Sequence, residues 1–173
     1  FTAALAAGDQ LKAIRIDEWG DLLEKGTTPD SYRPTLYDFL AHEALSFYSA
    51  GEQAALGENA FEIMADSPIF APVAEFLAWD PATTDTDSVL LKAIRLYQDL
   101  LRYHQNDRDE TAFTDADLYR LAFGYNQAVG PEKDDRYIAA LERFADEWQG
   151  QEVAGRAIYA WAVVLYGQGK YLQ

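Results

Sequence analysis

The chain has 173 residues, of which 49% are hydrophobic and 14% aromatic, and its 14 basic and 29 acidic residues give a formal net charge of −15. This length and apolar content suffice for a packed core, which argues against a disordered chain. The acidic balance excludes nucleic acid and anionic membrane surfaces as partners, because both require a cationic face. We interpret the acidity as a solvated exterior; the alternative is a docking surface for a basic partner.

The sequence contains no cysteine, which excludes thiol catalysis, disulfides and Cys-ligated metals. No apolar run approaches the roughly 20 residues that a membrane-spanning helix needs, so we expect no membrane insertion by this segment. The chain starts at Phe1 without a secretory leader pattern, which indicates a mature protein or a fragment.

Glycines divide the N-terminal part, where short helices are expected over 2–7 and 17–24. A polar loop then leads into a helix that we expect over 33–51, with Pro34 in its first turn and Gly51 at its C-terminal end. Apolar residues recur there at intervals of three and four, which predicts one buried stripe. The predicted stripe is formed by Leu36, Phe39, Leu40, Ala44, Phe47 and Tyr48.

Glycine and proline interrupt the pattern over 52–85, although the stretch is too apolar for a free linker. We predict a packed irregular crossover with one short helix near 72–79. About 30 residues is an unusual length for a connection inside a compact domain, so the crossover is interpreted as an insertion or a lid over a groove.

Strong helical periodicity begins at residue 86. The sequence DTDS at 85–88 predicts an N-cap, and a helix with a wide apolar face is expected to follow it. Thr114 is predicted to cap the next helix, and the pair Gly130 and Pro131 to end it.

Each of the last three helices carries apolar residues on one face. The predicted buried rows are Leu118, Leu121, Ala122 and Tyr125, then Tyr137, Leu141, Phe144 and Trp148, then Ala157, Ile158, Trp161, Ala162 and Leu165. No segment alternates with period two over a useful length, which predicts an all-α protein of antiparallel helical hairpins. We divide the single domain 1–173 into an irregular part, 1–85, and a hairpin part, 86–173.

The hairpin part contains a degenerate repeat. Ala140 and Ile158 are 18 residues apart, the spacing that these positions have in a tetratricopeptide repeat of about 34 residues. We therefore expect a degenerate tetratricopeptide-like right-handed array. The alternative is an unrelated helical bundle that follows the same packing rules.

Patterns that would carry chemistry are weak. His42 and Glu43 begin a zinc-protease-like pattern, but Ser46 occupies the position of the second histidine, so we expect a packed structural histidine. The acidic stretch at 80–87 lacks the central glycine and the terminal glutamate of a calcium loop. No glycine-rich phosphate loop or nucleophile elbow is present. The sequence therefore predicts no catalytic residue, no metal and no cofactor. We expect that the protein is not an enzyme.

Aromatic residues on the last helices could line the concave side of a helical array, although such stripes form the core more often. Three of them lie at or beside the edge of their buried rows and are the candidates for a partner-binding surface. They are Tyr119, Trp148 and Tyr159.

Three stretches resemble a known family: RPTLYDFLAHEALSFYS from residue 33, AIRLYQDLLRYHQ at 93–105 and DLYRLAFGYNQ at 117–127. They are similar to the N-terminal helical region of large bacterial alpha-2-macroglobulin-like proteins of the Bacteroidetes type. The resemblance covers about 30–173 and implies an exported protein of the periplasm or cell envelope that traps or inhibits endopeptidases. It transfers no functional residue, because the bait region and any thioester of that family belong to other domains.

Two hypotheses from different classes follow. The first is a non-catalytic helical scaffold and protein-interaction domain of an alpha-2-macroglobulin-like endopeptidase inhibitor, whose partner is another domain of the same chain or an envelope protein. The second is a self-contained peptide- or glycan-binding helical module of an envelope uptake system, with an aromatic groove.

Overall fold

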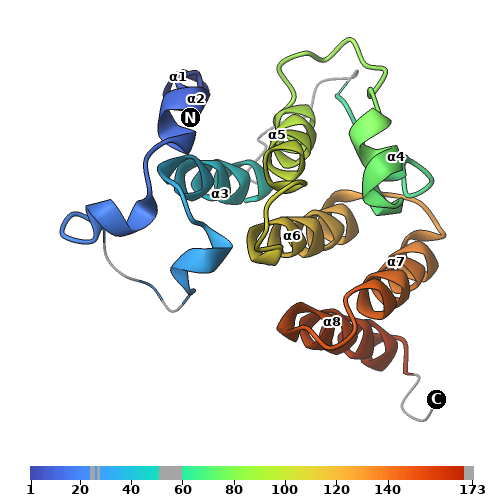
Figure 1. The fold of residues 1–173 in the computed structure, drawn as a ribbon. Coiled ribbons are helices and arrows are strands. Elements are labelled where there is room, and N and C mark those ends of the chain that lie inside the picture. Colours follow the sequence, from blue (N-terminus) through green and yellow to red (C-terminus); the bar gives the residue numbers. More distant parts are fainter. Residues whose placement is uncertain (24–25, 27, 51–59, 170–173) are drawn as a thin grey trace. The chain divides into compact units, whose positions relative to one another are not determined.

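The computed structural model describes residues 1–23, 26, 28–50 and 60–169 (Figure 1). Every regular element in these ranges is a helix, so the all-α prediction is confirmed. The chain forms two compact units. The first unit comprises Phe1–Phe61 and Thr83–Ala116, and the second comprises Glu62–Ala82 and Asp117–Gln173. The predicted crossover 52–85 is thus divided, because its central part packs with the C-terminal helices.

The N-terminal part of the first unit has shorter helices than predicted. Helix α1 spans Thr2–Leu5, helix α2 spans Gly8–Lys12, and a 3-10 turn, η1, spans Ile16–Trp19. The predicted break at Gly8 is wrong, since a glycine is tolerated in a first helical turn, where the backbone N–H groups need no partner within the helix. The predicted helix 17–24 is replaced by η1 as far as the structure describes that stretch.

Helix α3 spans Leu36–Ser49 and begins with a capping box. The Thr35 side chain accepts a hydrogen bond from the Asp38 backbone, and the Asp38 carboxylate accepts one from the Thr35 N–H. Pro34 therefore precedes the cap and does not occupy the first turn, which corrects the predicted start. The predicted C-terminal Gly51 lies outside the described residues.

The buried face of α3 differs from the predicted stripe. Phe47 is 64% exposed, and its ring centroid lies 5.6 Å from that of Phe1. Asp38 and His42, by contrast, are buried. These two polar residues enter the core because they have charged or hydrogen-bonding neighbours there, and they rotate the buried face by about one position. The buried residues are Tyr37, Asp38, Ala41, His42, Ala44, Leu45 and Tyr48.

Helix α5 spans Val89–His104, and Ser88 caps it as predicted by accepting a hydrogen bond from the Leu91 N–H. It packs against α3. Its apolar face is as wide as expected, but Gln98 and His104 are buried on it as well. A short 3-10 turn, η2 (Asp30–Tyr32), precedes α3 in the same unit.

The second unit begins with the irregular segment between residues 62 and 82. It contains a 3-10 turn, η3 (Pro68–Phe70), and helix α4 (Val73–Ala78), which confirms the short helix predicted near 72–79. Ile63, Ile69 and Phe76 are fully buried, so this part of the crossover is packed as expected. Residues 52–59 of the predicted crossover lie outside the described residues.

Helix α6 spans Thr111–Gln127 and starts three residues before the predicted cap, Thr114. Thr114 is buried inside the helix, where its hydroxyl donates to the Thr111 carbonyl. The prediction failed because Asp109, which accepts hydrogen bonds from the Thr111 N–H and hydroxyl, supplies the polar contact at the helix start instead. The helix ends before Gly130, which has a φ of 129°.

Helices α7 (Lys133–Glu147) and α8 (Glu152–Gly167) pack against each other. The row predicted for α7 is confirmed at Tyr137, Leu141 and Phe144, but the row predicted for α8 is wrong at Ile158, which is 53% exposed, and at Ala162. Helix α8 itself carries apolar residues on nearly all of its faces, so periodicity alone does not identify the face that is buried. The residues it buries are Val153, Ala154, Ala157 and Val164.

Two arginines hold η3 in place. The fully buried Arg120 donates to the Ile69 carbonyl at 2.6 Å, pairs with Asp117 at 2.7 Å, and lies 4.7 Å from the ring centroid of Phe76. Arg143 donates to the Phe70 carbonyl at 2.7 Å. Both carbonyls belong to the irregular segment, so side chains of α6 and α7 replace the backbone partners that a helix would provide.

We expect Gly124→Ala to destabilise the protein by ~1–3 kcal/mol through overpacking. An added Cβ would lie 2.7 Å from Ile69 Cγ1 and 3.0 Å from Phe70 Cε1, at the segment that the arginines hold. Gly155→Ala is the matched control: it also lies in a helix, its Cβ would meet nothing within 4 Å, and it should stabilise by up to ~1 kcal/mol. Urea unfolding measures both, and effects of the same sign would contradict the close packing.

Candidate functional site

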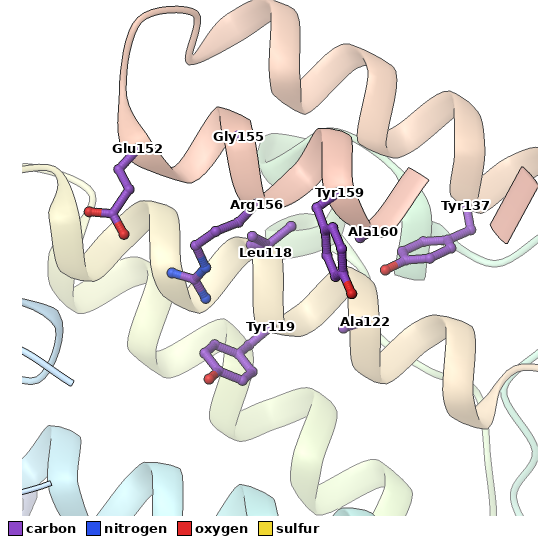
Figure 2. A pocket seen from close by; sticks show the side chains of 9 residues that line it. All are labelled: Leu118, Tyr119, Ala122, Tyr137, Glu152, Gly155, Arg156, Tyr159 and Ala160. Carbon is purple, nitrogen blue, oxygen red and sulfur yellow. The ribbon is translucent and has the colours of Figure 1, made fainter. Parts of the chain in front are cut away.

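A groove of about 570 Å³ lies on the second unit between α6 and α8, and Tyr137 of α7 also lines it (Figure 2). Ligand sites in proteins have volumes of roughly 300–1,000 Å³, so this groove has a suitable size. Figure 2 shows Arg156 and Tyr159 projecting from α8 toward α6, with Glu152 and Tyr137 toward opposite ends. The groove belongs entirely to the second unit.

Tyrosine side chains form its walls. Tyr119 on α6 is 41% exposed and Tyr159 on α8 is 73% exposed, so both rings are accessible to a ligand. Tyr137 is buried and stacks on Tyr125 with ring centroids 4.4 Å apart and planes 14° apart. Burial, followed by the neighbouring Tyr125, raises the pKa of Tyr137 to about 12. Its hydroxyl is therefore neutral near pH 7 and can act as a hydrogen-bond donor.

Small residues line the groove between these walls. Ala122, Gly155 and Ala160 contribute almost no side-chain volume. A Cβ at Gly155 would meet no atom within 4 Å, so the helix backbone is open to a ligand at this point. A groove with rigid rings at its sides and backbone at its base can receive a bulky side chain.

Two charged residues, Glu152 and Arg156, lie one helical turn apart on α8 and complete the lining. The Arg156 guanidinium lies 5.7 Å from the ring centroid of Tyr119, within the range of a cation–π interaction. This contact positions the Tyr119 ring and supplies N–H donors beside it. The groove therefore combines apolar surface with polar groups at one end.

The structure brings together two of the three predicted partner-binding residues. Tyr119 and Tyr159 both line the groove, but Trp148 does not. Trp148 is the C-cap residue of α7 and its ring lies 6.4 Å from that of Phe144, half-buried. Gly155 and Arg156 were not predicted from the sequence. The available signal was the glycine inside a helical pattern, because glycine lowers helix stability and such a position can have a functional reason.

The first unit has a second cavity, of about 330 Å³. Its lining includes Asp17, Asp30 and Glu43 together with Arg33, and it lacks a pair of exposed facing rings. Its mixture of acids and one guanidinium makes its lining more polar than that of the groove between α6 and α8.

Neither histidine belongs to a metal site in the described part of the chain, where no three His, Cys, Asp or Glu side chains are grouped to hold an ion. His42 is buried on α3, as the structural interpretation expected. His104 at the end of α5 is also buried and has a carboxylate oxygen 2.7 Å from each ring nitrogen. These carboxylates belong to Asp38 and Asp107.

The two histidines titrate in opposite directions. Burial, followed by repulsion from Arg33, lowers the pKa of His42 to about 4. Burial also disfavours the charged form of His104, but its hydrogen bonds to Asp38 and Asp107 outweigh this effect, and the pKa of His104 is raised. Near neutral pH, His42 is therefore neutral, whereas the surroundings of His104 favour its charged form relative to an ordinary histidine.

Comparison of the chain with protein-family models, with characterised proteins and with solved structures gives no significant match. No helix in the described ranges is long and apolar enough to cross a membrane. The geometry of the groove thus carries the functional argument.

We expect His42 to make the protein less stable as the pH falls from about 6.5 to about 4. The unfolded chain binds a proton on His42 in this window while the folded chain does not, so the free energy of unfolding decreases. The loss reaches ~3 kcal/mol at ~1.4 kcal/mol per pKa unit. Urea unfolding at several pH values measures it.

The variant His42→Gln cannot titrate and should lose less stability than the wild type over the same window. Each chain is compared with its own stability at pH 7, so a general cost of the substitution cancels. Parallel stability curves for the two chains would contradict a buried neutral His42.

Proposed function

We propose that this chain is a non-catalytic helical scaffold and protein-interaction domain that binds a segment of a partner protein in the groove between α6 and α8. The observation that carries the proposal is the pair of exposed tyrosine rings, Tyr119 and Tyr159, at the sides of a base of small residues. Exposed aromatic rings beside a concave apolar surface are typical of binding sites, where they supply contact area at little entropic cost.

Binding is a better account of this groove than catalysis. Its described lining contains no histidine, serine, threonine or lysine, and the chain has no cysteine. General acid–base catalysis requires a group that exchanges a proton near the working pH. Tyr137 does not meet this requirement, because its pKa is raised to about 12 by burial and by Tyr125. Glu152 is the one carboxylate of the described lining, which holds no second carboxylate or histidine to work with it.

The groove favours a peptide segment that inserts a bulky apolar side chain. Such a side chain would contact the two tyrosine rings and lie over Gly155, while Arg156 and Glu152 would bind polar backbone groups of the same segment. A pocket in which one buried anchor makes most of the contacts is the usual source of affinity in such complexes.

We further propose that the helices form a tetratricopeptide-like array in a larger alpha-2-macroglobulin-like protein of the cell envelope. The resemblance of the stretches at 33–49, 93–105 and 117–127 supports this context, as does the packing of α7 against α8. The partner would then be another domain of the same polypeptide or an envelope protein. Macroglobulin domains in the surrounding reading frame would support this context, and their absence would contradict it.

A second candidate is glycan binding within an envelope uptake system. Tyr119 and Tyr159 favour it, because exposed rings can stack on the apolar faces of sugars while Arg156 and Glu152 bind hydroxyl groups. A glycan array probed with the purified chain distinguishes this candidate from peptide binding.

We expect a random peptide library displayed on phage to yield ligands that bind this groove. Tyr119→Ala and Tyr159→Ala should each weaken the selected peptides by about 30-fold, as expected when an aromatic anchor of an interface is truncated. Isothermal titration calorimetry with a synthetic copy of the best peptide measures the affinity.

Two further variants make the test specific. Gly155→Leu should abolish binding by filling the groove while leaving the helical circular dichroism spectrum unchanged. Tyr166→Ala removes another exposed ring of α8, one that does not line the groove, and should leave the affinity unchanged. Equal losses for Tyr159→Ala and Tyr166→Ala would show that peptides adhere to α8 without using the groove.

A further inference from the structure

The side chain of His104 is only 2% exposed, yet both of its ring nitrogens face carboxylates. Nε2 lies 2.7 Å from Asp38 Oδ1, and Nδ1 lies 2.7 Å from Asp107 Oδ2. A neutral imidazole has one N–H, whereas a carboxylate offers only lone pairs. The two contacts are therefore both hydrogen bonds only when His104 is an imidazolium with a proton on each nitrogen.

Asp38 lies among hydrogen-bond donors at the start of α3. It occupies the first turn of α3, where the backbone N–H groups favour negative charge. Its Oδ2 accepts hydrogen bonds from the Thr35 N–H at 2.9 Å and the Thr35 hydroxyl at 2.7 Å. These bonds leave Oδ1 for His104, which lies in the last turn of α5, where positive charge is favoured.

The other groups near His104 do not supply the negative charge that these two carboxylates supply. His42 on α3 is neutral near pH 7 because burial and Arg33 lower its pKa to about 4. The neighbouring Tyr103 ring has its centroid 4.4 Å from the imidazole and lies 4.9 Å from the ammonium of Lys12 on α2. The anions that hold the imidazolium are thus Asp38 from α3 and Asp107 from the turn after α5.

The two carboxylates differ in their access to water. The side chain of Asp38 is 1% exposed, whereas that of Asp107 is 41% exposed. If the imidazolium loses one proton to the solvent, the remaining N–H must serve one of them. Leaving the buried carboxylate without its donor is the more costly choice, because water can reach only Asp107.

We propose that His104 holds the turn 105–110, which leads from α5 into α6, and that it does so only when its ring is doubly protonated. With both nitrogens protonated, it binds α3 through Asp38 and the turn through Asp107. Loss of the Nδ1 proton leaves two lone pairs facing each other at the Asp107 contact, so the turn loosens while the Asp38 bond persists. The side chain therefore couples external pH to the order of one specific turn.

Nuclear magnetic resonance of the whole chain labelled with ¹⁵N-histidine and ¹³C tests the proposal between pH 5 and pH 10. The nitrogen shifts of His104 should indicate an imidazolium at pH 7, and a transition should follow above pH 6.5. The side-chain ¹³C signal of Asp107 and the backbone ¹³C signals of 105–110 should change with the same midpoint, while those of Thr35 and Asp38 should not. A neutral His104 at pH 7 would overturn the proposal.

Asp107→Asn and Asp109→Asn form a matched pair of variants. Asp107→Asn removes the anion at Nδ1 and should lower the midpoint of His104 by about one pH unit or more. The pH dependence of the turn should also disappear. Asp109 lies two residues away, bonds Thr111 and not His104, and its replacement should leave the midpoint unchanged. Equal behaviour of the two variants would overturn the proposal.

His104→Gln provides a further measurement if either aspartate variant is poorly folded. Glutamine cannot titrate, so the ¹³C signals of 105–110 should be independent of pH between 6 and 10 in this chain. If the signals of the turn still change with pH in His104→Gln, the turn responds to another group, and the proposed role of His104 would be wrong.

Discussion

Each unit buries an ionisable side chain that is held by a partner of opposite charge. A buried charge without a partner would cost several kcal/mol, on the order of the whole stability of a small domain. His104 is paired with Asp38 in the first unit, and Arg120 is paired with Asp117 in the second. Because His104 also bonds across to α3 and Arg120 also bonds to η3, these side chains constrain how the surrounding elements pack.

The effect of this constraint is local and geometric. Asp38 can reach His104 only if α3 turns its first polar residues toward the core. Arg120 can donate to the Ile69 carbonyl only if η3 stays against α6. The first pair joins α5 to α3, whereas Arg120, which pairs with Asp117 of its own helix, joins α6 to η3. The apolar residues around them then fill the space that these contacts define.

The same constraint explains how much of the fold could be predicted from the sequence. Helices α5 and α7 were predicted because their strong periodicity and flanking polar residues agree with each other. The burial of His42 was expected, but the buried face of α3 as a whole was not, since hydrophobicity gives no sign that Asp38 enters the core. The face of α8 was not either, because nearly all of its residues are apolar and its packing partner decides which of them are buried.

The groove could be predicted only in part for a similar reason. Tyr119 and Tyr159 lie at the edges of helical rows, which is visible in the sequence. Their approach to each other depends on the packing of helices that are far apart in the chain. Trp148 also lies at the edge of a predicted row, but it follows the last residue of α7, and its ring lies beside that of Phe144. The contact of Arg156 with the Tyr119 ring likewise depends on the packing of α8 beside α6.

Helix α8 has a further consequence for the behaviour of the protein in solution. From Ala157 to Gly167 it contains no charged residue and no proline, and it is rich in β-branched and aromatic residues. Such a stretch is prone to cross-β association when a chain unfolds. The net charge of −15 opposes the approach of two chains, and salt screens this repulsion. Resistance to aggregation on heating is therefore a balance between one uncharged helix and the charge of the whole chain.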